Sequence, residues 1–207
     1  MEEKEKYILE QAKILFYRYG VKSVSMDDLA RHAGVSKKTL YEYFCDKTDI
    51  IKRVLEMHCQ NQQDKIRSIG CSHLNSIDVL IAVTEFIVAE IKDTNPAFIY
   101  DLNKYYPEIM RTFAESKNKF VRDCIIQNLH CGIKEGLYRT DMNRDIIALI
   151  YTSRMSTLAQ DEVMKFQDFS YADVVKELML YHIRGISSAK GIKYYEEKIK
   201  NETPLKS

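Results

Sequence analysis

Glycine and proline are scarce in this sequence of 207 residues, which has 7 glycines, 3 prolines and no tryptophan. Sheet-rich folds need many turns, and turns use glycine and proline. The shortage therefore disfavours a sheet-rich fold and predicts long helices joined by few connections. Hydrophobic residues still make up 45% of the chain, which is enough for a packed core and excludes a disordered protein.

The chain also lacks an excess of charge of either sign. It carries 31 Lys and Arg residues against 30 Asp and Glu residues, a net charge of +1. A strongly basic chain would have indicated nucleic acid, and a strongly acidic one a solvating tail. The overall charge therefore indicates no class of partner.

Long uncharged apolar runs are missing too. A membrane-spanning helix needs about 18 such residues, and the best candidate, residues 77–91, is interrupted by Asp78, Glu85 and Glu90. The first six residues are mostly charged and no apolar segment follows them, so they do not form a secretory signal. We therefore expect a cytoplasmic protein that does not associate with membranes.

The five cysteines are odd in number and show no C-x-x-C spacing. They are Cys45, Cys59, Cys71, Cys124 and Cys131. The favoured interpretation is a set of reduced, mostly buried thiols, with a thiol sensor or a metal site as the alternative. Histidines lie near three of these cysteines, but none has the spacing of a zinc module. No metal, cofactor or catalytic site is predicted.

Hydrophobic periodicity predicts about nine helices and no strand, so the expected fold class is all-α. The expected helices cover approximately residues 4–19, 26–34, 37–44, 48–68, 77–93, 97–105, 107–136, 141–158 and 170–188. Side chains able to cap helix starts are Ser25 with Asp28, Ser36, Asp46 with Asp49, and Ser170 with Asp173. A charged tail from Lys193 is expected to end in disorder.

Two of the short helices, joined across Gly34-Val35-Ser36, form a helix-turn-helix signature. The small side chain of Ala30 lets the two helices cross closely, and Gly34 relieves the backbone at the turn. Leu40 and Phe44 share one face of the second helix and are expected to be core. The N-terminal end of that helix can then project into the major groove of DNA.

The side chains expected to contact DNA are polar or cationic and lie near the starts of helices. Lys37 and Lys38 can donate to guanine, and Thr39 can bond a base or contact the methyl group of thymine. Tyrosine hydroxyls and helix N-termini favour phosphate. The predicted DNA-binding residues are Ser25, Ser36, Lys37, Lys38, Thr39, Tyr41, Tyr43 and Lys47.

The local charge supports this interpretation only modestly, because residues 31–47 carry an excess of +2. Tight binding to DNA would therefore need two copies of the chain. A helix pair with a glycine turn is also compatible with an ordinary helical bundle, so the pair alone does not decide between the two.

Residues 7 to 55 closely resemble the N-terminal domain of the TetR family of bacterial transcriptional regulators. The matching residues are Ala12, Leu15, Phe16, Gly20, Ser25–Ala30, Ala33–Lys37, Thr39–Tyr41, Tyr43, Phe44 and Lys47. The most specific part is the string A-G-V-S-K-x-T-L-Y-x-Y-F-x-x-K after a first helix. Lys38 departs mildly from the family, in which a small or varied residue is common at this position.

The resemblance implies an all-helical homodimer, with a helix-turn-helix DNA-binding domain over residues 1–47 and a ligand-sensing and dimerisation domain over residues 48–207. In the family, the last two large helices usually form a dimeric four-helix bundle, and here they would be residues 144–158 and 170–188. The expected interface residues are Val175, Leu178, Met179, His182 and Ile186, with Gly185 permitting close approach. The alternative is that these side chains lie in the core of one chain.

A pocket for an unknown small-molecule effector is expected between helices of the C-terminal region. Aromatic and methionine side chains are common both in such pockets and in plain cores, so a core role is the alternative for each. The candidate lining residues are Phe86, Tyr105, Tyr106, Met110, Phe113, Tyr151 and Met155. Arg154 can neutralise an anionic effector or form a salt bridge.

The predicted function is a ligand-responsive regulator, a repressor rather than an activator, that binds a palindromic operator in double-stranded DNA and is then associated with the nucleoid. The helix from Thr48 is the expected lever between the two domains. One alternative is a helical sensor that acts through a protein partner. The other is a helical-bundle enzyme, although the chain has no Glu-x-x-His motif and no local nucleophile signature.

Overall fold

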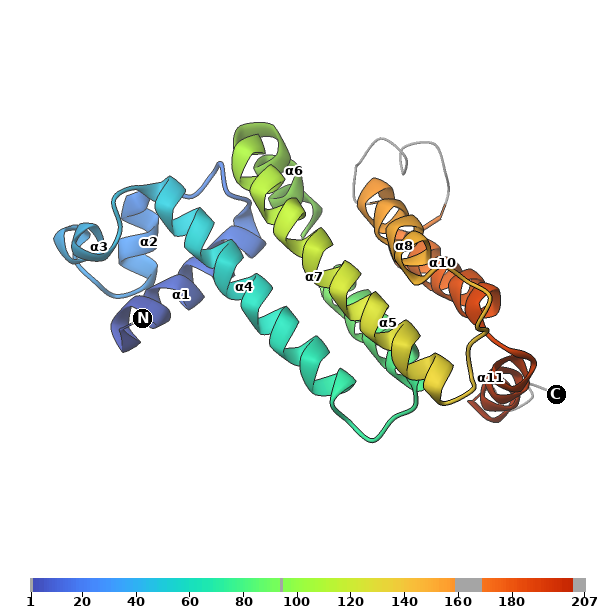
Figure 1. Cartoon of the computed structure of the whole chain (residues 1–207). Coiled ribbons are helices and arrows are strands. Elements are labelled where there is room, and N and C mark those ends of the chain that lie inside the picture. Colours follow the sequence, from blue (N-terminus) through green and yellow to red (C-terminus); the bar gives the residue numbers. More distant parts are fainter. Residues whose placement is uncertain (1, 94, 159–168, 203–207) are drawn as a thin grey trace. The chain divides into compact units, whose positions relative to one another are not determined.

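The computed structural model describes residues 2–93, 95–158 and 169–202. Within these ranges the chain forms ten helices and one isolated antiparallel bridge, between Tyr138 and Ser187 (Figure 1). The helices are α1 (Glu3–Tyr19), α2 (Met26–His32), α3 (Lys37–Tyr43), α4 (Lys47–Gly70), α5 (Ser76–Asp93), α6 (Pro96–Tyr105), α7 (Pro107–Lys134), α8 (Arg144–Leu158), α10 (Tyr171–Ile186) and α11 (Ala189–Glu202). The predicted all-α fold class is confirmed, with ten helices in these ranges instead of about nine.

The chain divides into two compact units by the packing of its backbone. The first unit contains residues 1–64 and 93–117, and the second contains residues 65–92 and 118–207. Both α4 and α7 contribute residues to each unit. The predicted domain boundary at residues 47 and 48 concerns function and stays a prediction. By packing, the first unit continues past that boundary and also includes α6.

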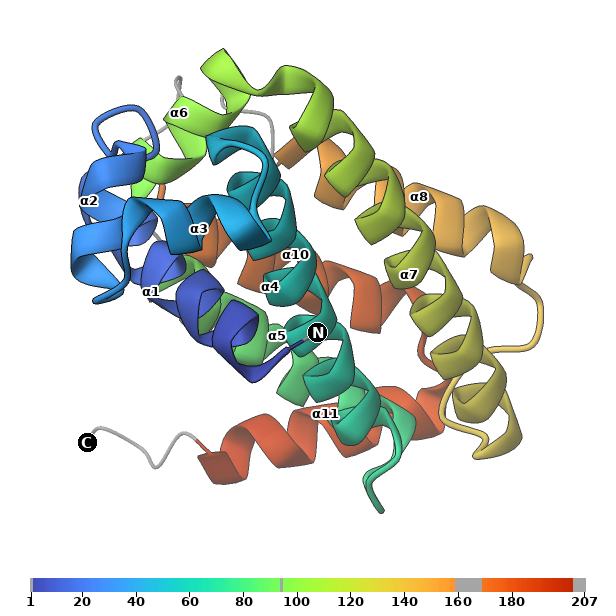
Figure 2. The same cartoon turned by 90° about the vertical axis from the view of Figure 1, so that its left-hand side faces the viewer.

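The core of the first unit is built from one face of each of its helices. Figures 1 and 2 both show α2 and α3 lying side by side next to α1. The largest buried side chains of this unit include Phe16, Leu40, Phe44, Ile50 and Phe98. Helix α3 buries only Leu40 among its own residues, and Lys37, Lys38, Tyr41 and Glu42 are exposed to solvent.

The second unit has its own core, in which Tyr138 and Tyr195 are the largest fully buried side chains. Tyr138 packs over α7 at Gly132, where an added Cβ would lie 2.1 Å from the Cδ2 atom of Tyr138. The Tyr138 hydroxyl donates to Oδ1 of Asn128 at 2.9 Å. A glycine in this helix is therefore required by close packing and not by an unusual backbone angle.

The charged segment from Lys193 was expected to be a tail and not a helix, but its residues up to Glu202 belong to α11. Tyr195 is buried, and the Tyr194 hydroxyl donates to Oδ2 of Asp78 at 2.6 Å. Lys198 Nζ lies 2.9 Å from Oδ1 of the same carboxylate. The charged composition concealed an amphipathic helix that is fixed to α5 by Asp78. Residues 203–207 lie outside the described part of the chain.

The five cysteines are free thiols; Cys45 and Cys71 are exposed and the other three are partly buried. The expectation of mostly buried thiols is therefore wrong, because Cys45 and Cys71 lie in the connections that follow α3 and α4. Among the residues that the structure describes, no group of three or more His, Cys, Asp or Glu side chains is placed to hold a metal ion. The helices in these same ranges include none that is long and apolar enough to cross a membrane.

Candidate DNA-binding surface

The start of α2 is fixed by a capping box. The Ser25 hydroxyl oxygen accepts from the backbone N–H of Asp28 at 3.2 Å, and Oδ2 of Asp28 accepts from the backbone N–H of Ser25 at 3.0 Å. The Ser25 hydroxyl also donates to this carboxylate at 2.6 Å. These hydrogen bonds lower the pKa of Asp28 below its ordinary value. The capping box predicted here is confirmed.

The turn between α2 and α3 closes in a Schellman motif. Gly34 has a φ of +65°, in the left-handed region where glycine carries no steric penalty. The backbone N–H of Val35 donates to the carbonyl of Ala30 at 3.0 Å, and that of Gly34 donates to the carbonyl of Arg31 at 3.3 Å. The end of α2 is thus satisfied by the backbone, and the direction in which α3 leaves is fixed.

Ser36 caps α3 and orders the first turn of the helix. Its hydroxyl oxygen accepts from the backbone N–H of Thr39 at 3.0 Å, and the two side-chain hydroxyls lie 2.9 Å apart. Leu40 and Phe44 are 0% and 1% exposed, so the opposite face of α3 is locked into the core of the first unit. An ordered first turn on an anchored helix is the arrangement that reads the major groove.

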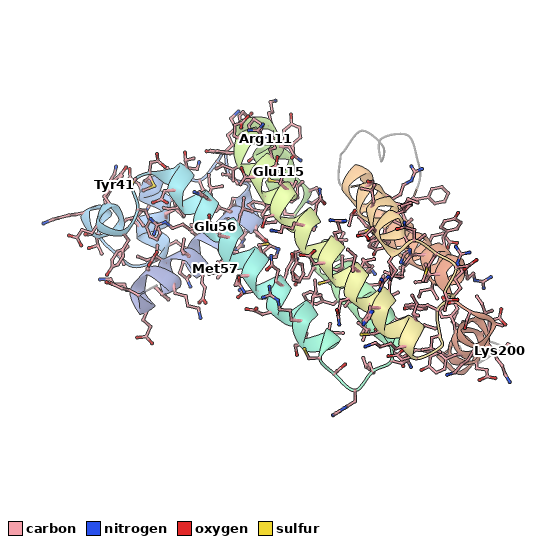
Figure 3. All side chains as sticks on the ribbon, viewed as in Figure 1. Tyr41, Glu56, Met57, Arg111, Glu115 and Lys200 are labelled. Atoms are coloured by element: carbon pink, nitrogen blue, oxygen red, sulfur yellow. The ribbon has the colours of Figure 1, made fainter. Side chains whose placement is uncertain are left out.

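Three of the predicted residues of α3 face solvent. Lys37 and Lys38 are exposed, and Tyr41 is 48% exposed and projects from the helix (Figure 3). Lys37 Nζ lies 2.9 Å from Oδ1 of Asp27 in α2, and this bond raises the pKa of Lys37 above its ordinary value. Sequence reasoning missed Asp27, although an acidic residue in the first turn of α2 was a visible signal.

Three further predicted contacts, Thr39, Tyr43 and Lys47, are more enclosed, and Thr39 is partly buried. Tyr43 is partly buried against the core of the first unit, and burial together with a hydrogen bond to the Glu2 carboxylate raises its pKa. Lys47, the first residue of α4, is also partly buried, and burial lowers its pKa. The structure therefore brings all eight predicted residues to α2, α3 and their flanks, but it exposes them to different degrees.

A cluster centred on Arg53 supports α3 from the inside of the first unit. The Arg53 guanidinium bonds both oxygens of Asp49, at 2.7 and 3.1 Å, and Oε1 of Glu5 at 2.7 Å. It lies over the ring of Phe44, 5.3 Å from the ring centroid. Asp49 Oδ2 in turn accepts from the backbone N–H of Cys45 at 3.2 Å. The cluster thus joins α1, the end of α3 and the first turns of α4.

The candidate effector-pocket residues fall into both units. Tyr106, Met110 and Phe113 pack against the core of the first unit, where Tyr105 is exposed. Tyr151 belongs to the core of the second unit, and Met155 packs against this core. Phe86, in the same unit, is partly buried. Arg154 is exposed on α8. Their role in binding an effector stays a prediction.

The predicted interface residues on α10 lie mainly inside the second unit. Val175, Met179 and Ile186 are 3%, 5% and 2% exposed within a single chain, while Leu178 and His182 are partly buried. Burial lowers the pKa of His182 to about 4. The exposed large apolar side chains of this unit are instead Ile146, Leu149, Ile150, Phe169 and Tyr181, together with Leu74 and Ile199. Within a single chain Val175, Met179 and Ile186 therefore occupy core positions, and the interface role predicted for them stays a prediction.

Comparison with known proteins supports the interpretation of the helix-turn-helix. Residues 8–54 match the family described as bacterial regulatory proteins, tetR family. Over 142 residues, 67% of this chain and 70% of the relative, the chain is 25% identical to the HTH-type transcriptional repressor KstR2 of Rhodococcus jostii (strain RHA1). Over 148 residues, 63% of this chain and 80% of the relative, it is 27% identical to an HTH-type transcriptional regulator of Staphylococcus aureus (strain USA300).

The fold itself also has solved counterparts. One is a crystal structure described as a putative transcriptional regulator from Saccharomonospora viridis in complex with choline. It aligns with 91% of this chain and 100% of its own length, with a TM-score of 0.69 and 19% sequence identity. At this identity the likeness concerns the fold, and it extends over both compact units of the chain.

Proposed function

Because the chain belongs to the TetR family of bacterial transcriptional regulators, we propose that it is a repressor that binds a palindromic operator as a homodimer and is released by a small-molecule effector. The observation that carries this proposal is the geometry of α3. Its first turn is capped by Ser36 and its inner face is held by Leu40 and Phe44, while Lys37, Lys38 and Tyr41 are exposed.

The predicted DNA-binding residues divide by chemistry into base and phosphate contacts. Lys37, Lys38 and Thr39 lie in the first turn of α3, so they are the residues proposed to reach base edges. Tyr41 and Lys47, with the backbone at the N-terminus of α2 that follows Ser25, are proposed to contact phosphate. The hydroxyls of Ser25 and Tyr43 already bond carboxylates within the chain, so they are the weaker members of the set.

The dimer is proposed to form through the exposed apolar face of α8 and the adjoining side of α10. Ile146, Leu149 and Ile150 recur at helical spacing on α8 and are 53%, 57% and 54% exposed. Tyr181 on α10 is 77% exposed. Such a row on one helix is costly to leave in water and is typical of an interface. The two copies of α3 in the dimer, held about 34–36 Å apart, would then span one turn of DNA.

The effector is proposed to act by shifting the population of the dimer away from the spacing that fits DNA. Coupling of this kind between two sites is typically about 1–3 kcal/mol. The helical fold of the choline-bound relative shows that a chain of this architecture can hold a small molecule, which supports a ligand-responsive role. No catalytic role is proposed. A sensor that acts through a protein partner is disfavoured by the intact, exposed cations of α3.

The experiment that tests the proposal is selection of bound sequences from a random duplex pool, at two salt concentrations. We expect a palindromic motif whose affinity falls steeply with salt, because Lys and Arg contacts release counterions from phosphate. Lys37→Ala should weaken binding, whereas Lys200→Ala, which removes one exposed charge from α11 (Figure 3), should not. Failure to enrich any sequence at low salt would contradict the proposed function.

A further inference from the structure

A single carboxylate joins α6 to the turn between α1 and α2. Oδ2 of Asp101 accepts from the backbone N–H of Lys22 at 2.8 Å, across 79 positions of the sequence. Lys22 is three residues before Ser25, the capping residue of α2. The bond therefore fixes the backbone immediately upstream of the helix-turn-helix, and its acceptor belongs to α6, which holds none of the residues proposed to contact DNA.

The backbone at this point is shaped to receive Asp101. Gly20 ends α1 with a φ of +77°, in the region that L side chains rarely adopt. A Cβ added there would lie 2.8 Å from Oδ2 of Asp101 and 3.9 Å from the carbonyl oxygen of Ala97. Only glycine leaves room for the carboxylate, so the close approach of α6 depends on both residues.

Other contacts along α6 strengthen the same attachment. The Asn95 side chain caps α6 by accepting from the N–H of Ala97 at 2.9 Å, and its amide donates to the carbonyl of Arg18 at 3.3 Å. Phe98 is buried in the core of the first unit, with its ring centroid 4.5 Å from that of Tyr17 in α1. The helix is thus held to α1 at its start and in its middle.

The end of α6 is attached by Lys22 itself. The ammonium of Lys22 lies 5.0 Å from the ring centroid of Tyr105. A hydrogen bond between these two side chains raises the pKa of Lys22 and lowers the pKa of Tyr105. Lys22 is therefore engaged twice by α6, through its backbone N–H and through its side chain.

The path of the chain makes this attachment relevant to regulation. The segment 93–117, which contains α6, belongs to the first unit, but residues 65–92 before it and residues 118–207 after it belong to the second. A change in the second unit that displaces this segment has to act on the contacts that α6 makes with α1 and the turn that follows it. Asp101 accepts from the backbone within this turn, so a displacement of α6 would reach the residues just before α2 through this bond.

We propose that Asp101 is a positioning residue for operator binding. Its bond to the N–H of Lys22 is the contact through which α6 controls the position of α2 and α3. This inference rests on the proposed function. Thermodynamic linkage makes the coupling reciprocal, so operator binding at α3 must also be felt at α6. The proposal can therefore be tested with the operator alone, without knowledge of the effector.

The test is hydrogen exchange of the full chain, free and bound to the operator duplex obtained by selection. In the wild-type chain, operator binding should slow exchange in α3, at Lys22 and in α6. In Asp101→Ala, slowing in α3 should persist while slowing in α6 is lost, and operator affinity should fall about tenfold. Asp101→Asn keeps an oxygen acceptor for the Lys22 N–H and should stay within about threefold of wild type.

Glu115→Ala is the matched control, since it removes an exposed carboxylate of the first unit from α7 (Figure 3) and should change neither readout. The wild-type measurement needs no variant: an operator that slows exchange in α3 but not in α6 would overturn the inference, even if Asp101→Ala fails to fold. Normal operator affinity in a folded Asp101→Ala chain would overturn it as well. A wild-type chain that selects no operator would overturn the proposed function together with this inference.

Discussion

Lys37 and Asp27 form an ion pair that joins α2 and α3, the two helices that together form the reading head, with Nζ of Lys37 2.9 Å from Oδ1 of Asp27. Their side chains are 54% and 60% exposed, so the pair contributes little to the stability of the fold. The pair matters instead for the charge of Lys37, because the Asp27 carboxylate already balances this charge in the free protein. In the proposed complex, contact of Lys37 with DNA would therefore exchange one anion for another.

Removing that neighbour should strengthen DNA binding. Asp27→Asn frees Lys37 and removes a negative charge from the surface that approaches phosphate, so we expect operator affinity to rise about two- to tenfold at low salt. Lys37→Ala should lower the affinity but leave the slope of log K against log salt close to that of wild type, because Lys37 is proposed to contact a base edge and not a phosphate. Fluorescence anisotropy over a salt series measures both quantities.

The matched control for Asp27→Asn is Asp145→Asn, which breaks the exposed pair between Arg122 and Asp145 in the second unit. It should leave operator affinity unchanged. Weaker binding by Asp27→Asn than by wild type would mean that the pair positions Lys37 for its contact, and the expectation of a competing anion would then be wrong.

Arg53 should support DNA binding without touching DNA. Arg53→Ala leaves the carboxylates of Asp49 and Glu5, which are 20% and 15% exposed, without their shared cation. We expect a loss of about 1–2 kcal/mol in the free energy of unfolding, reduced by the partial exposure of Arg53. Operator affinity should fall while its salt slope is unchanged, since no phosphate contact is removed.

Lys52→Ala is the control for this change, because Lys52 is the preceding residue of α4 and its ion pair with Glu56, at 4.0 Å, is exposed on both sides. Chemical denaturation and the salt series together check the prediction. A salt slope that drops by about 0.9 in Arg53→Ala would show that Arg53 reaches the DNA backbone.

The reading head was predictable from sequence because its determinants are local. Ser25 with Asp28, Gly34 and Ser36 act on residues within a few positions of themselves, and the structure shows each of them in the predicted capping or turn role. Leu40 and Phe44 are buried as their spacing indicated. Short-range hydrogen bonds and a period of 3.6 residues leave a visible signature in the sequence.

The contacts of α6 could not be predicted in the same way. Asp101 and Lys22 are 79 positions apart, and nothing in the sequence around either residue marks them as partners. The cluster around Arg53 shows the same contrast. Its pair with Asp49 could be predicted from sequence, because the two residues are four positions apart on one helix. Its bond to Glu5 could not, because Glu5 is 48 positions away. Long-range polar contacts depend on the packing of the whole unit.

The choice among apolar stripes also lay beyond the sequence. Helix α10 carries apolar residues on more than one side, and the structure shows that Val175, Met179, Ile183 and Ile186 face the core of their own unit. Periodicity gives the direction of each side chain around the helix axis, but it does not say which neighbour covers that side. The exposed row on α8 was visible only after the core of the second unit was known.

The exposed row on α8 predicts how the dimer can be broken. Leu149→Glu places a charge in the middle of Ile146, Leu149 and Ile150, so we expect a folded monomer in analytical ultracentrifugation. Affinity for the palindrome should fall about 100-fold or more, because two linked half-sites bind far more tightly than one. Leu74→Glu, at an exposed apolar residue of the loop before α5, should stay dimeric.

A dimeric Leu149→Glu chain would place the interface away from α8. The prediction concerns oligomeric state and not folding, since Leu149 is 57% exposed in the single chain and its replacement removes little buried surface. Circular dichroism and the melting temperature should therefore stay close to those of wild type.

Gly132→Ala should destabilise the second unit. The added Cβ would lie 2.1 and 2.3 Å from ring atoms of Tyr138, whose hydroxyl is held by Asn128, so the ring cannot move without losing that bond. Overpacking of this kind costs about 1–3 kcal/mol. Chemical denaturation should show the loss, and Gly70→Ala, where nothing lies within 4 Å of the new Cβ, should show none. Equal stability of the two variants would refute the close packing of Tyr138 on α7.

His182 should make the stability of the second unit depend on pH. Its Nε2 atom is buried without a hydrogen-bond partner, and burial lowers its pKa from 6.5 to about 4. The folded state therefore holds the neutral ring, whereas the unfolded chain takes up a proton near its ordinary pKa. The stability from this group is complete above about pH 6.5 and is lost as the pH falls toward 4, with a slope of up to about 1.4 kcal/mol per pH unit.

Replacement of His182 separates its titration from that of the other acids and bases. His182→Leu should flatten the dependence of the unfolding free energy on pH between about 6.5 and 4, while His73→Gln, in the exposed loop after α4, should leave it as in wild type. Denaturation at a series of pH values measures both variants. The prediction is wrong if the plots of unfolding free energy against pH stay parallel for His182→Leu and wild type through this range. That result would show that His182 takes up its proton as readily in the folded state as in the unfolded chain, and that its burial does not exclude the charged ring.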